Sequence, residues 1–383
     1  MRHLKMGLMV MVFVLGAASV AFAAPFAYVP NIGSNTLTVF DLATNAVVAT
    51  IPVGLYPVGV AISPDLTRVY VVNQGGYGWP GTISVISTAT NTVIATIAVG
   101  MAAIGGALSP DGRFLYVTNQ LSGTVTVIDT LTLAVVATVP VGWWPMGVVV
   151  SPDGKFVYVA NRDSFTVSVI STATDTVVAT IWVGRYPTDV TVTPNGAFIY
   201  VTNMLDGSVS VISTATNAVI ATILVGGSPY GIVVNPAGTL VYVATQTGTI
   251  AVISTATQTL VGTIPVAGAT RSVGVSPDGT RLYVTTLATN ALLVIDLGTL
   301  ATVATVPVGL TPSILGAFIG IPPAAPVGSP VAPGSGVGQR GDDDQNVEVG
   351  EHDQDRGRGR GQGQDTDERE KGEAERSHRE TGE

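Results

Sequence analysis

A tetrapeptide that begins with Tyr-Val recurs seven times along the chain and constrains the fold more than any other feature. Asn ends the first five copies and Thr ends the last two. The copies begin at Tyr28, Tyr70, Tyr116, Tyr158, Tyr200, Tyr242 and Tyr283, with spacings of 42, 46, 42, 42, 42 and 41 residues. A period of this length is typical of the four-stranded blade of a β-propeller.

Each repeat contains the same order of strands and turns. In the fourth repeat, a strand leads into the turn Ser151-Pro152-Asp153-Gly154, where Pro presets one backbone dihedral and Gly accepts a positive one. The Tyr-containing strand follows, then alternating strands over 166–170 and 177–183. Proline recurs at one register of the last strand, at Pro52, Pro140, Pro265 and Pro307. Since proline cannot donate to a ladder, this strand is predicted to be the outermost of its blade.

The two ends of the repeat region predict how the ring closes. The chain enters the first repeat at the Tyr-containing strand, with no inner strand before it. Residues 309–320 resemble an inner strand and its approach, and we expect 313–319 to complete the first blade. The predicted fold is therefore all-β, a seven-bladed β-propeller of four-stranded blades, closed by the C-terminal strand.

The repeat tetrapeptide, exact in Tyr116-Val117-Thr118-Asn119 and Tyr200-Val201-Thr202-Asn203, resembles that of the YVTN family of β-propeller repeat proteins. The resemblance covers residues 26–320. Relatives in that family include surface-layer proteins of prokaryotes and propeller domains attached to periplasmic redox enzymes. The resemblance therefore implies export and a scaffold role, but no single chemistry.

The chain is predicted to have three parts: a signal peptide at 1–23, the propeller at 24–321, and a disordered tail at 322–383. Arg2 and Lys5 precede an apolar stretch, and Ala21-Phe22-Ala23 suits a signal peptidase. The alternative is an uncleaved anchor, but the stretch is short for a spanning helix of about 20 residues. We expect cleavage after Ala23 and a secreted or periplasmic protein that is not inserted in a membrane. The tail is rich in Pro and Gly and then in charges, which cannot offset the entropy of ordering.

The charge of the chain argues against nucleic acid as a partner. The formal net charge is −9. From Arg340 onward, 15 Asp or Glu against 8 Arg or Lys leave −7, whereas the 11 Asp and 7 Arg or Lys of residues 24–321 leave −4. A weakly acidic folded part suits neither nucleic acid nor an anionic membrane.

The residue types of the predicted propeller exclude much of enzyme chemistry. Residues 24–321 contain no His, Cys or Glu. Ser-His-Asp and Cys-His mechanisms, imidazole metal sites and haem-ligating histidines are therefore absent from this region. Acid–base chemistry would depend on Asp, Tyr, Lys or Arg alone. We predict no catalytic residue, no cofactor and no metal site, and hence no enzyme.

Aromatic residues outside the repeat tyrosines cluster in loops of one predicted face. These loops follow the Tyr-containing strand or join an outer strand to the next inner strand, and strand alternation brings both kinds to the same face. The loop set also contains Arg271, Asp189 and Asp206. The predicted binding residues are Tyr56, Tyr77, Trp79, Trp143, Trp144, Phe165, Tyr186, Tyr230, Arg162 and Arg185. An alternative is that Tyr56, Trp144 and Tyr186, each followed by Pro, are wedges between blades.

The sequence thus predicts an exported, monomeric, non-enzymatic module that binds a protein or glycan at the cell envelope through one loop face. The alternative is an accessory subunit or enzyme of a periplasmic redox or lactonase-type system, with a ligand in the central channel. A purely structural envelope component is a third interpretation. Large rigid rings on a scaffold's loops favour the first.

Overall fold

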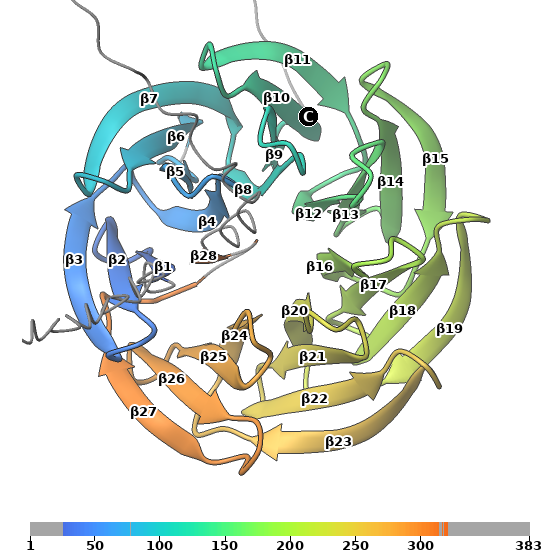
Figure 1. Cartoon of the computed structure of the whole chain (residues 1–383). Helices are drawn as coiled ribbons and strands as arrows, with labels where there is room; N and C mark the ends of the chain where they lie inside the picture. The colour runs from blue at the N-terminus through green and yellow to red at the C-terminus, as the bar shows by residue number, and fades with distance from the viewer. Residues whose placement is uncertain (1–25, 77, 314–315, 317, 321–383) are drawn as a thin grey trace, which may run out of the picture. The chain divides into compact units, whose positions relative to one another are not determined.

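Seven four-stranded antiparallel sheets form a ring around a central channel in the computed structural model of the chain (Figure 1). The structure describes residues 26–76, 78–313, 316 and 318–320. These residues belong to the first of two units, Met1–Val327, and the second, Gly328–Glu383, lies outside the described residues. The predicted signal peptide and tail also lie outside them. The prediction of an all-β, seven-bladed propeller is confirmed.

The strands fall into four sets according to their distance from the channel. The innermost strands are β28 (Ile319–Gly320), β4 (Pro57–Ile62), β8 (Ala103–Leu108), β12 (Pro145–Val150), β16 (Pro187–Val192), β20 (Pro229–Val234) and β24 (Thr270–Val275). The second strands are β1 (Phe26–Asn31), β5 (Arg68–Asn73), β9 (Phe114–Asn119), β13 (Phe156–Asn161), β17 (Phe198–Asn203), β21 (Leu240–Thr245) and β25 (Arg281–Thr286). The third strands are β2 (Thr36–Asp41), β6 (Pro80–Ser87), β10 (Thr124–Asp129), β14 (Thr166–Ser171), β18 (Ser208–Ser213), β22 (Thr249–Ser254) and β26 (Ala291–Asp296). The outermost strands are β3 (Ala46–Pro52), β7 (Thr92–Met101), β11 (Ala134–Pro140), β15 (Thr176–Trp182), β19 (Ala218–Leu224), β23 (Thr259–Pro265) and β27 (Thr302–Pro307).

The ring closes through a blade that contains both ends of the described chain. In blade 1, β28 pairs with β1, so that Ala27 lies opposite Ile319. The Tyr28 amide donates to the Phe318 carbonyl at 2.8 Å. The predicted closure by the C-terminal strand is confirmed, although the described part of that strand is shorter than expected. The four prolines predicted to mark outermost strands do end β3, β11, β23 and β27.

The core lies between the blades. Tyr70, Tyr116, Tyr158, Tyr200 and Tyr283 are among the largest fully buried side chains. Tyr116 of blade 3, for example, belongs to a cluster with Val148 and Val157 of blade 4. The repeat tyrosines therefore bind each blade to the next, as apolar burial in a propeller requires.

Asn and Gly of the repeat form a second contact between blades. In blade 4, the Asn161 amide donates to Thr166 Oγ1 at 3.1 Å and to Ser168 Oγ at 2.9 Å. Gly142, which leaves blade 3, lies so close to Asn161 that a Cβ on it would sit 2.7 Å from the Asn161 Cβ. A glycine is needed there because any side chain would push the two blades apart.

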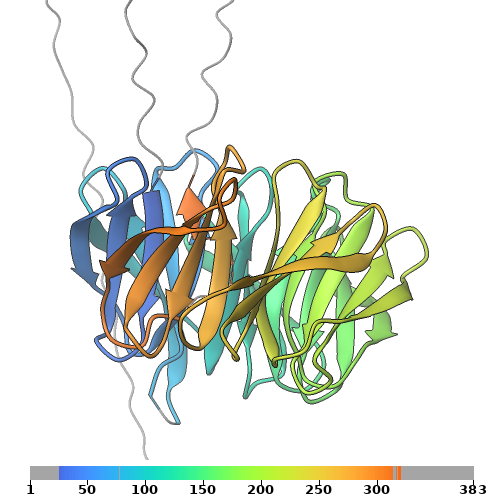
Figure 2. The ribbon, with the colours of Figure 1, turned by 90° about the horizontal axis from the view of Figure 1, so that it is seen from below.

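Loops and turns emerge on opposite sides of the ring, which Figure 2 shows from the side. We call one side the loop face. It carries the loops between blades and the loops after the second strands, such as 141–144 and 162–165 of blade 4. The other side, the turn face, carries the remaining hairpin turns, such as 109–113 and 130–133 of blade 3. No helix among the described residues is long and apolar enough to cross a membrane.

Candidate binding face

The loops of the loop face are hydrogen-bonded in pairs. At blade 4, the Arg162 amide donates to the Trp144 carbonyl at 3.0 Å, and the Asp163 amide donates to the Trp143 carbonyl at 3.2 Å. The Trp143 amide donates to Ser164 Oγ at 2.7 Å. Each loop that leads into a blade is thereby fixed to the loop after that blade's second strand. Their side chains stand on a firm support, which suits a binding surface.

The residue before five of the inner strands, β4, β8, β12, β16 and β20, adopts a left-handed backbone conformation. Tyr56, Trp144 and Tyr186 have φ values of 53°, 55° and 56°. Ala102 and Ser228, at the equivalent positions, have φ values of 54°. The backbone therefore demands an unusual conformation at this position but not an aromatic side chain. The three rings must serve packing or binding.

Two predicted binding residues are almost fully accessible. Trp79 is 71% exposed and Trp143 is 76% exposed. Trp79 lies in a loop that is four residues longer than its equivalent, because Asn73 pairs with Thr82 whereas Asn31 pairs with Thr36. Tyr56 is 46% exposed, so it is not a buried wedge. Tyr77 lies outside the described residues.

Arg162 organises a half-buried aromatic cluster between blades 4 and 5. Its guanidinium carbon lies 4.7 Å from the Tyr186 ring centroid and 5.7 Å from that of Trp144. Phe165 and Tyr186 have centroids 5.8 Å apart with an interplanar angle of 38°. Arg162 Nε also lies 3.7 Å from Asp163 Oδ1. Cation–π and tilted ring contacts hold these side chains in one place. Trp144 and Tyr186 therefore match the wedge alternative better than Tyr56 does.

Tyr230 does not lie in a loop, and this part of the prediction is wrong. It is the second residue of β20 and only 8% exposed. The inner strand begins at Pro229, so Tyr230 already belongs to the strand that lines the channel. The Arg271 guanidinium carbon lies 5.0 Å from the Tyr230 ring centroid. Burial raises the pKa of the Tyr230 hydroxyl.

Tyr230 belongs to an apolar layer that fills the channel at its loop-face end. Its buried members, Val58, Ile104, Met146 and Tyr230, are each the second residue of an inner strand. Ile32, Trp144 and Met204 pack against them. We call this layer the plug. Trp144 thus joins the plug to the surface.

Arg185, a predicted binding residue, forms an ion pair with Asp206. Arg185 is exposed, and its Nε donates to Asp206 Oδ1 at 2.6 Å while its amide donates to Asp206 Oδ2 at 2.7 Å. The amide, and then the guanidinium, hold the pKa of the Asp206 carboxyl below its usual value. Asp189, also predicted in a loop, is instead buried within β16.

Sequence reasoning missed the exposed aliphatic side chains around these aromatics. Leu55 and Leu310 occupy the position of Trp143 in their own loops, and Leu121 and Leu205 occupy that of Asp163. All four side chains are about half exposed, at 55%, 56%, 48% and 52% respectively. The repeat register could have revealed them, because each lies in the same two loop positions. Met101 is exposed at the same level of the ring.

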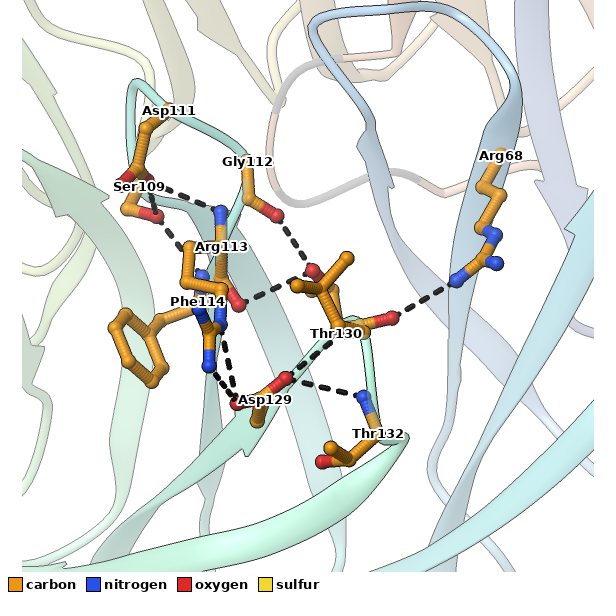
Figure 3. A network of polar contacts seen from close by, with 10 residues as sticks. Arg68, Ser109, Asp111, Gly112, Arg113, Phe114, Asp129, Thr130 and Thr132 are labelled. Carbon is orange, nitrogen blue, oxygen red and sulfur yellow. Dashed lines mark hydrogen bonds and ion pairs between the residues drawn. The ribbon is translucent and has the colours of Figure 1, made fainter.

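The turn face has a different composition. Leu131 and Leu300 are its exposed large hydrophobic residues within the described chain. Its polar groups bond to one another, as Figure 3 shows for blades 2 and 3. Arg113 Nη2 lies 2.6 Å from Asp129 Oδ2, Thr130 Oγ1 donates to the Gly112 carbonyl at 2.7 Å, and Arg68 Nη1 donates to the Thr130 carbonyl at 2.8 Å. Such internal pairing leaves few groups for a partner.

Comparison with known proteins supports the fold more than any activity. The family model described as "Lactonase, 7-bladed beta-propeller" matches residues 81–180. No curated protein sequence matches the chain significantly. Kuenenia stuttgartiensis hydrazine synthase is similar at 25% identity and a TM-score of 0.61, over 67% of this chain and 88% of that one.

Two further solved structures share the architecture. A functionally unknown protein from Desulfotomaculum acetoxidans has 21% identity and a TM-score of 0.67, over 77% of this chain and 98% of that one. The dihydro-heme d1 dehydrogenase NirN, in complex with DHE, has 18% identity and a TM-score of 0.58, over 76% of each chain. At these identities the likeness shows the fold alone.

Proposed function

We propose that the chain is a non-enzymatic binding module outside the cytoplasm that holds a protein partner against its loop face. The observation that carries the proposal is the pair of exposed tryptophans, Trp79 and Trp143, on firmly bonded loops. A rigid, exposed indole loses little conformational entropy on binding and buries a large area. Arg162 and Trp144 lie in the same pair of loops as Trp143, and Tyr186 of the loop that leads into blade 5 contacts Arg162.

A protein suits this face better than a glycan does. Leu55, Leu121, Leu205 and Leu310 share the face with the tryptophans, and apolar, aromatic and Arg side chains together are typical of the core of a protein interface. Sugars need free polar side chains beside the rings. Here the carboxylate of Asp206 is already bonded to Arg185, and that of Asp163 lies beside Arg162.

The residue content of the propeller supports a binding role without catalysis. Residues 24–321 contain no His, Cys or Glu. The segment that matches the lactonase model has five carboxylates, and those of Asp111, Asp129 and Asp153 are engaged in turn-face hydrogen bonds. A second candidate function, a ligand in the central channel, is favoured by a cavity of about 390 Å³ between the inner strands.

The experiment compares three variants of the secreted protein. Trp79→Ala and Trp143→Ala truncate the loop-face indoles, and Leu131→Ala truncates a side chain that is 71% exposed on the turn face. Each protein is immobilised and exposed to envelope extract, and any protein retained by the parent is purified for affinity measurement. We expect Trp143→Ala to lose about 2 kcal/mol or more of binding energy. Leu131→Ala should bind like the parent.

The same variants decide between the other interpretations. Retention on a glycan array that Trp143→Ala abolishes and Leu131→Ala preserves would assign the face to a glycan. Unchanged partner binding by both tryptophan variants, with melting temperatures several degrees lower, would show that the rings serve packing. Turnover of a lactone by the purified parent, abolished by replacing one Asp, would contradict the non-enzymatic role.

A further inference from the structure

A cavity of about 390 Å³ occupies the channel on the turn-face side of the plug. Its wall is formed by inner strands β4, β8, β12, β16, β20 and β24 together with Gly316, Phe318 and Ile319. At one end lie Pro64 and Pro110, which are exposed in turn-face turns. At the other end, the second residues of β4, β8, β12 and β20 form the plug. The cavity is therefore a blind pocket that opens toward the turn face.

Asp189 is the charged side chain among the residues that line this pocket in the described chain. It is the third residue of β16, immediately below the plug, so it lies at the closed end. The equivalent residues of four other inner strands are Gly59, Gly105, Gly147 and Gly231. A Cβ on Gly147 would lie 2.5 Å from Asp189 Oδ1, so the absence of a side chain there makes room for the carboxyl.

The carboxyl is held by backbone donors and by no ion pair among the described residues. Its Oδ1 accepts from the Val190 amide at 2.9 Å, and its Oδ2 accepts from the Ile232 amide at 3.2 Å. A carboxylate can accept about four hydrogen bonds, so both oxygens retain capacity for a ligand. A buried acid without a charged partner is unfavourable for folding, and such groups are concentrated at functional sites.

Hydrogen-bond acceptors other than the Asp189 carboxylate also line the pocket. Inner strands are sheet edges, whose free backbone groups face the channel. The carbonyl oxygens of Val60 and Gly106 lie 2.7 and 2.9 Å from the position that a Cβ would take on Gly316, which places both on the channel side. The remaining wall is apolar, with Val148, Ile232 and Val273 among its residues. Acceptors above an apolar wall suit a ligand with a charged donor and a hydrocarbon body.

We propose that this pocket binds a small protonated amine, with its ammonium group at the Asp189 carboxylate and its carbon chain against the valine-rich wall. No covalent step is involved. The site is separate from the loop face, because the plug lies between them. Binding here and binding of a protein partner can therefore fail independently.

The proposal has a pH dependence that follows from the same burial. Burial raises the pKa of the Asp189 carboxyl from 3.8 to about 7. Tyr230 of β20 interacts electrostatically with Asp189, and the charges of Arg271 and Arg162 lie near Tyr230. Neither arginine forms an ion pair with Asp189 in the described residues. An alkylammonium ion stays protonated like a lysine, so binding at low pH must displace the proton of Asp189.

Isothermal titration of the full chain with n-butylammonium chloride tests the proposal, with n-butanol as the uncharged control. We expect saturable binding of the cation at pH 8 that is about 30-fold weaker at pH 5.5. Asp189→Asn should bind at least about tenfold more weakly at pH 8 and show no pH dependence. Asp153→Asn removes an equal charge from an exposed turn and should behave like the parent.

Several outcomes would overturn the proposal. They are equal affinity for n-butanol, equal affinity at pH 8 and pH 5.5, or equal binding by Asp189→Asn. Affinity for a neutral ketone such as 2-butanone that rises on acidification would show instead that the protonated acid donates to a neutral ligand. If Asp189→Asn does not fold, Asp189→Gly, which introduces the residue of four other blades, provides the same comparison. The pH profile of the parent needs no variant.

Discussion

The two faces of the ring are made by the same repeats but differ in what they expose. Among the described residues, eight large hydrophobic side chains are exposed on the loop face: Leu55, Tyr56, Trp79, Met101, Leu121, Trp143, Leu205 and Leu310. On the turn face the described exposed ones are Leu131 and Leu300. Turn-face side chains bond within their own turns, as Ser151 does with Asp153 at 2.6 Å. The turn sequences, which are similar in all blades, thus form turns whose polar groups bond to one another. The loop sequences, which differ between blades, leave apolar side chains exposed to solvent.

The two ends of the channel differ in the same direction. Toward the loop face, large side chains from four inner strands meet and fill the channel. Toward the turn face, small and β-branched residues leave a pocket with one buried acid. One propeller thereby offers a broad apolar surface and an enclosed polar point on opposite sides. The difference suggests two binding functions rather than one.

The sealed end predicts the largest change in stability. Tyr230→Ala should reduce the free energy of unfolding by about 3–5 kcal/mol, because it removes a buried aromatic side chain from the plug and leaves a cavity. Tyr56→Ala, at a position that is 46% exposed, is the matched control and should change it by about 0.5 kcal/mol or less. Thermal or urea unfolding measures both. Similar small effects of the two substitutions would mean that the plug is not a packed layer.

Asp189, in the pocket on the turn-face side of the plug, predicts a change in the free energy of unfolding of opposite sign. A carboxyl whose pKa rises from 3.8 to about 7 binds a proton in the folded state between these values, while the unfolded chain does not. Its contribution therefore makes the parent less stable as pH rises from about 4 to 7, with little further change above. Asp189→Asn should stabilise the protein by about 1–3 kcal/mol at pH 8, less than the full cost of about 4 kcal/mol because one amide loses its acceptor.

The measurement is urea unfolding of the parent and Asp189→Asn at pH 4 and pH 8, without added amine. At pH 4 most of the advantage of the variant should be lost, because the acid is protonated in the folded state and only partly ionised in the unfolded state. A variant that is equally stable or less stable than the parent at pH 8 would show that Asp189 is ionised at little cost. The Asp189 carboxylate would then carry no unfavourable burial energy that a bound ammonium group could offset.

The neighbouring residues Trp143 and Trp144 distinguish an exposed side chain from a packed one on the loop face. Trp144→Ala should lower the free energy of unfolding by about 1–3 kcal/mol, since Trp144 is half-buried against the plug and Arg162. Trp143→Ala should change it by about 0.5 kcal/mol or less. Alanine fits the backbone conformation of Trp144, because Ala102, at the equivalent position of another blade, has a φ of 54°. Equal losses would place both rings in the core and remove the basis of the binding face.

The fold was predictable because the same pattern of strands and turns occurs seven times in the sequence. Tyr-Val, the turn sequences and the edge prolines each point to the same strand order, and the missing inner strand at one end predicted the closure by β28. Local sequence and global architecture agree in every blade, which is the condition for reading a fold from sequence.

The candidate site was less predictable because one residue of register decides between surface and channel. Tyr186 precedes Pro187 and lies on the loop face, whereas Tyr230 follows Pro229 and is buried. Asp189 differs in the same way, and only its environment of glycines and apolar strands raises its pKa. The loop-face leucines were not predicted, because their exposure follows from two loop positions that all repeats share and not from an aromatic residue type. Position along a repeat carries more information here than residue type.

The smallest expected effect compares one ion pair from each face. Arg113–Asp129 on the turn face and Arg185–Asp206 on the loop face both have 2.6 Å contacts, but the Asp129 side chain is 8% exposed and that of Asp206 is 28% exposed. The hydrogen bond from Arg113, together with backbone amides, lowers the pKa of Asp129 from 3.8 to about 2. That stabilisation is complete above about pH 4 and is lost as pH falls toward 2. Asp129→Asn should lower Tm by about 1–2 °C at pH 7 and leave it unchanged near pH 2, because an exposed arginine partner is largely screened. Asp206→Asn should have a still smaller effect in differential scanning calorimetry. A larger effect from Asp206 would mean that the loop face depends on its charges for structure, and that Arg185 is not free to contact a partner.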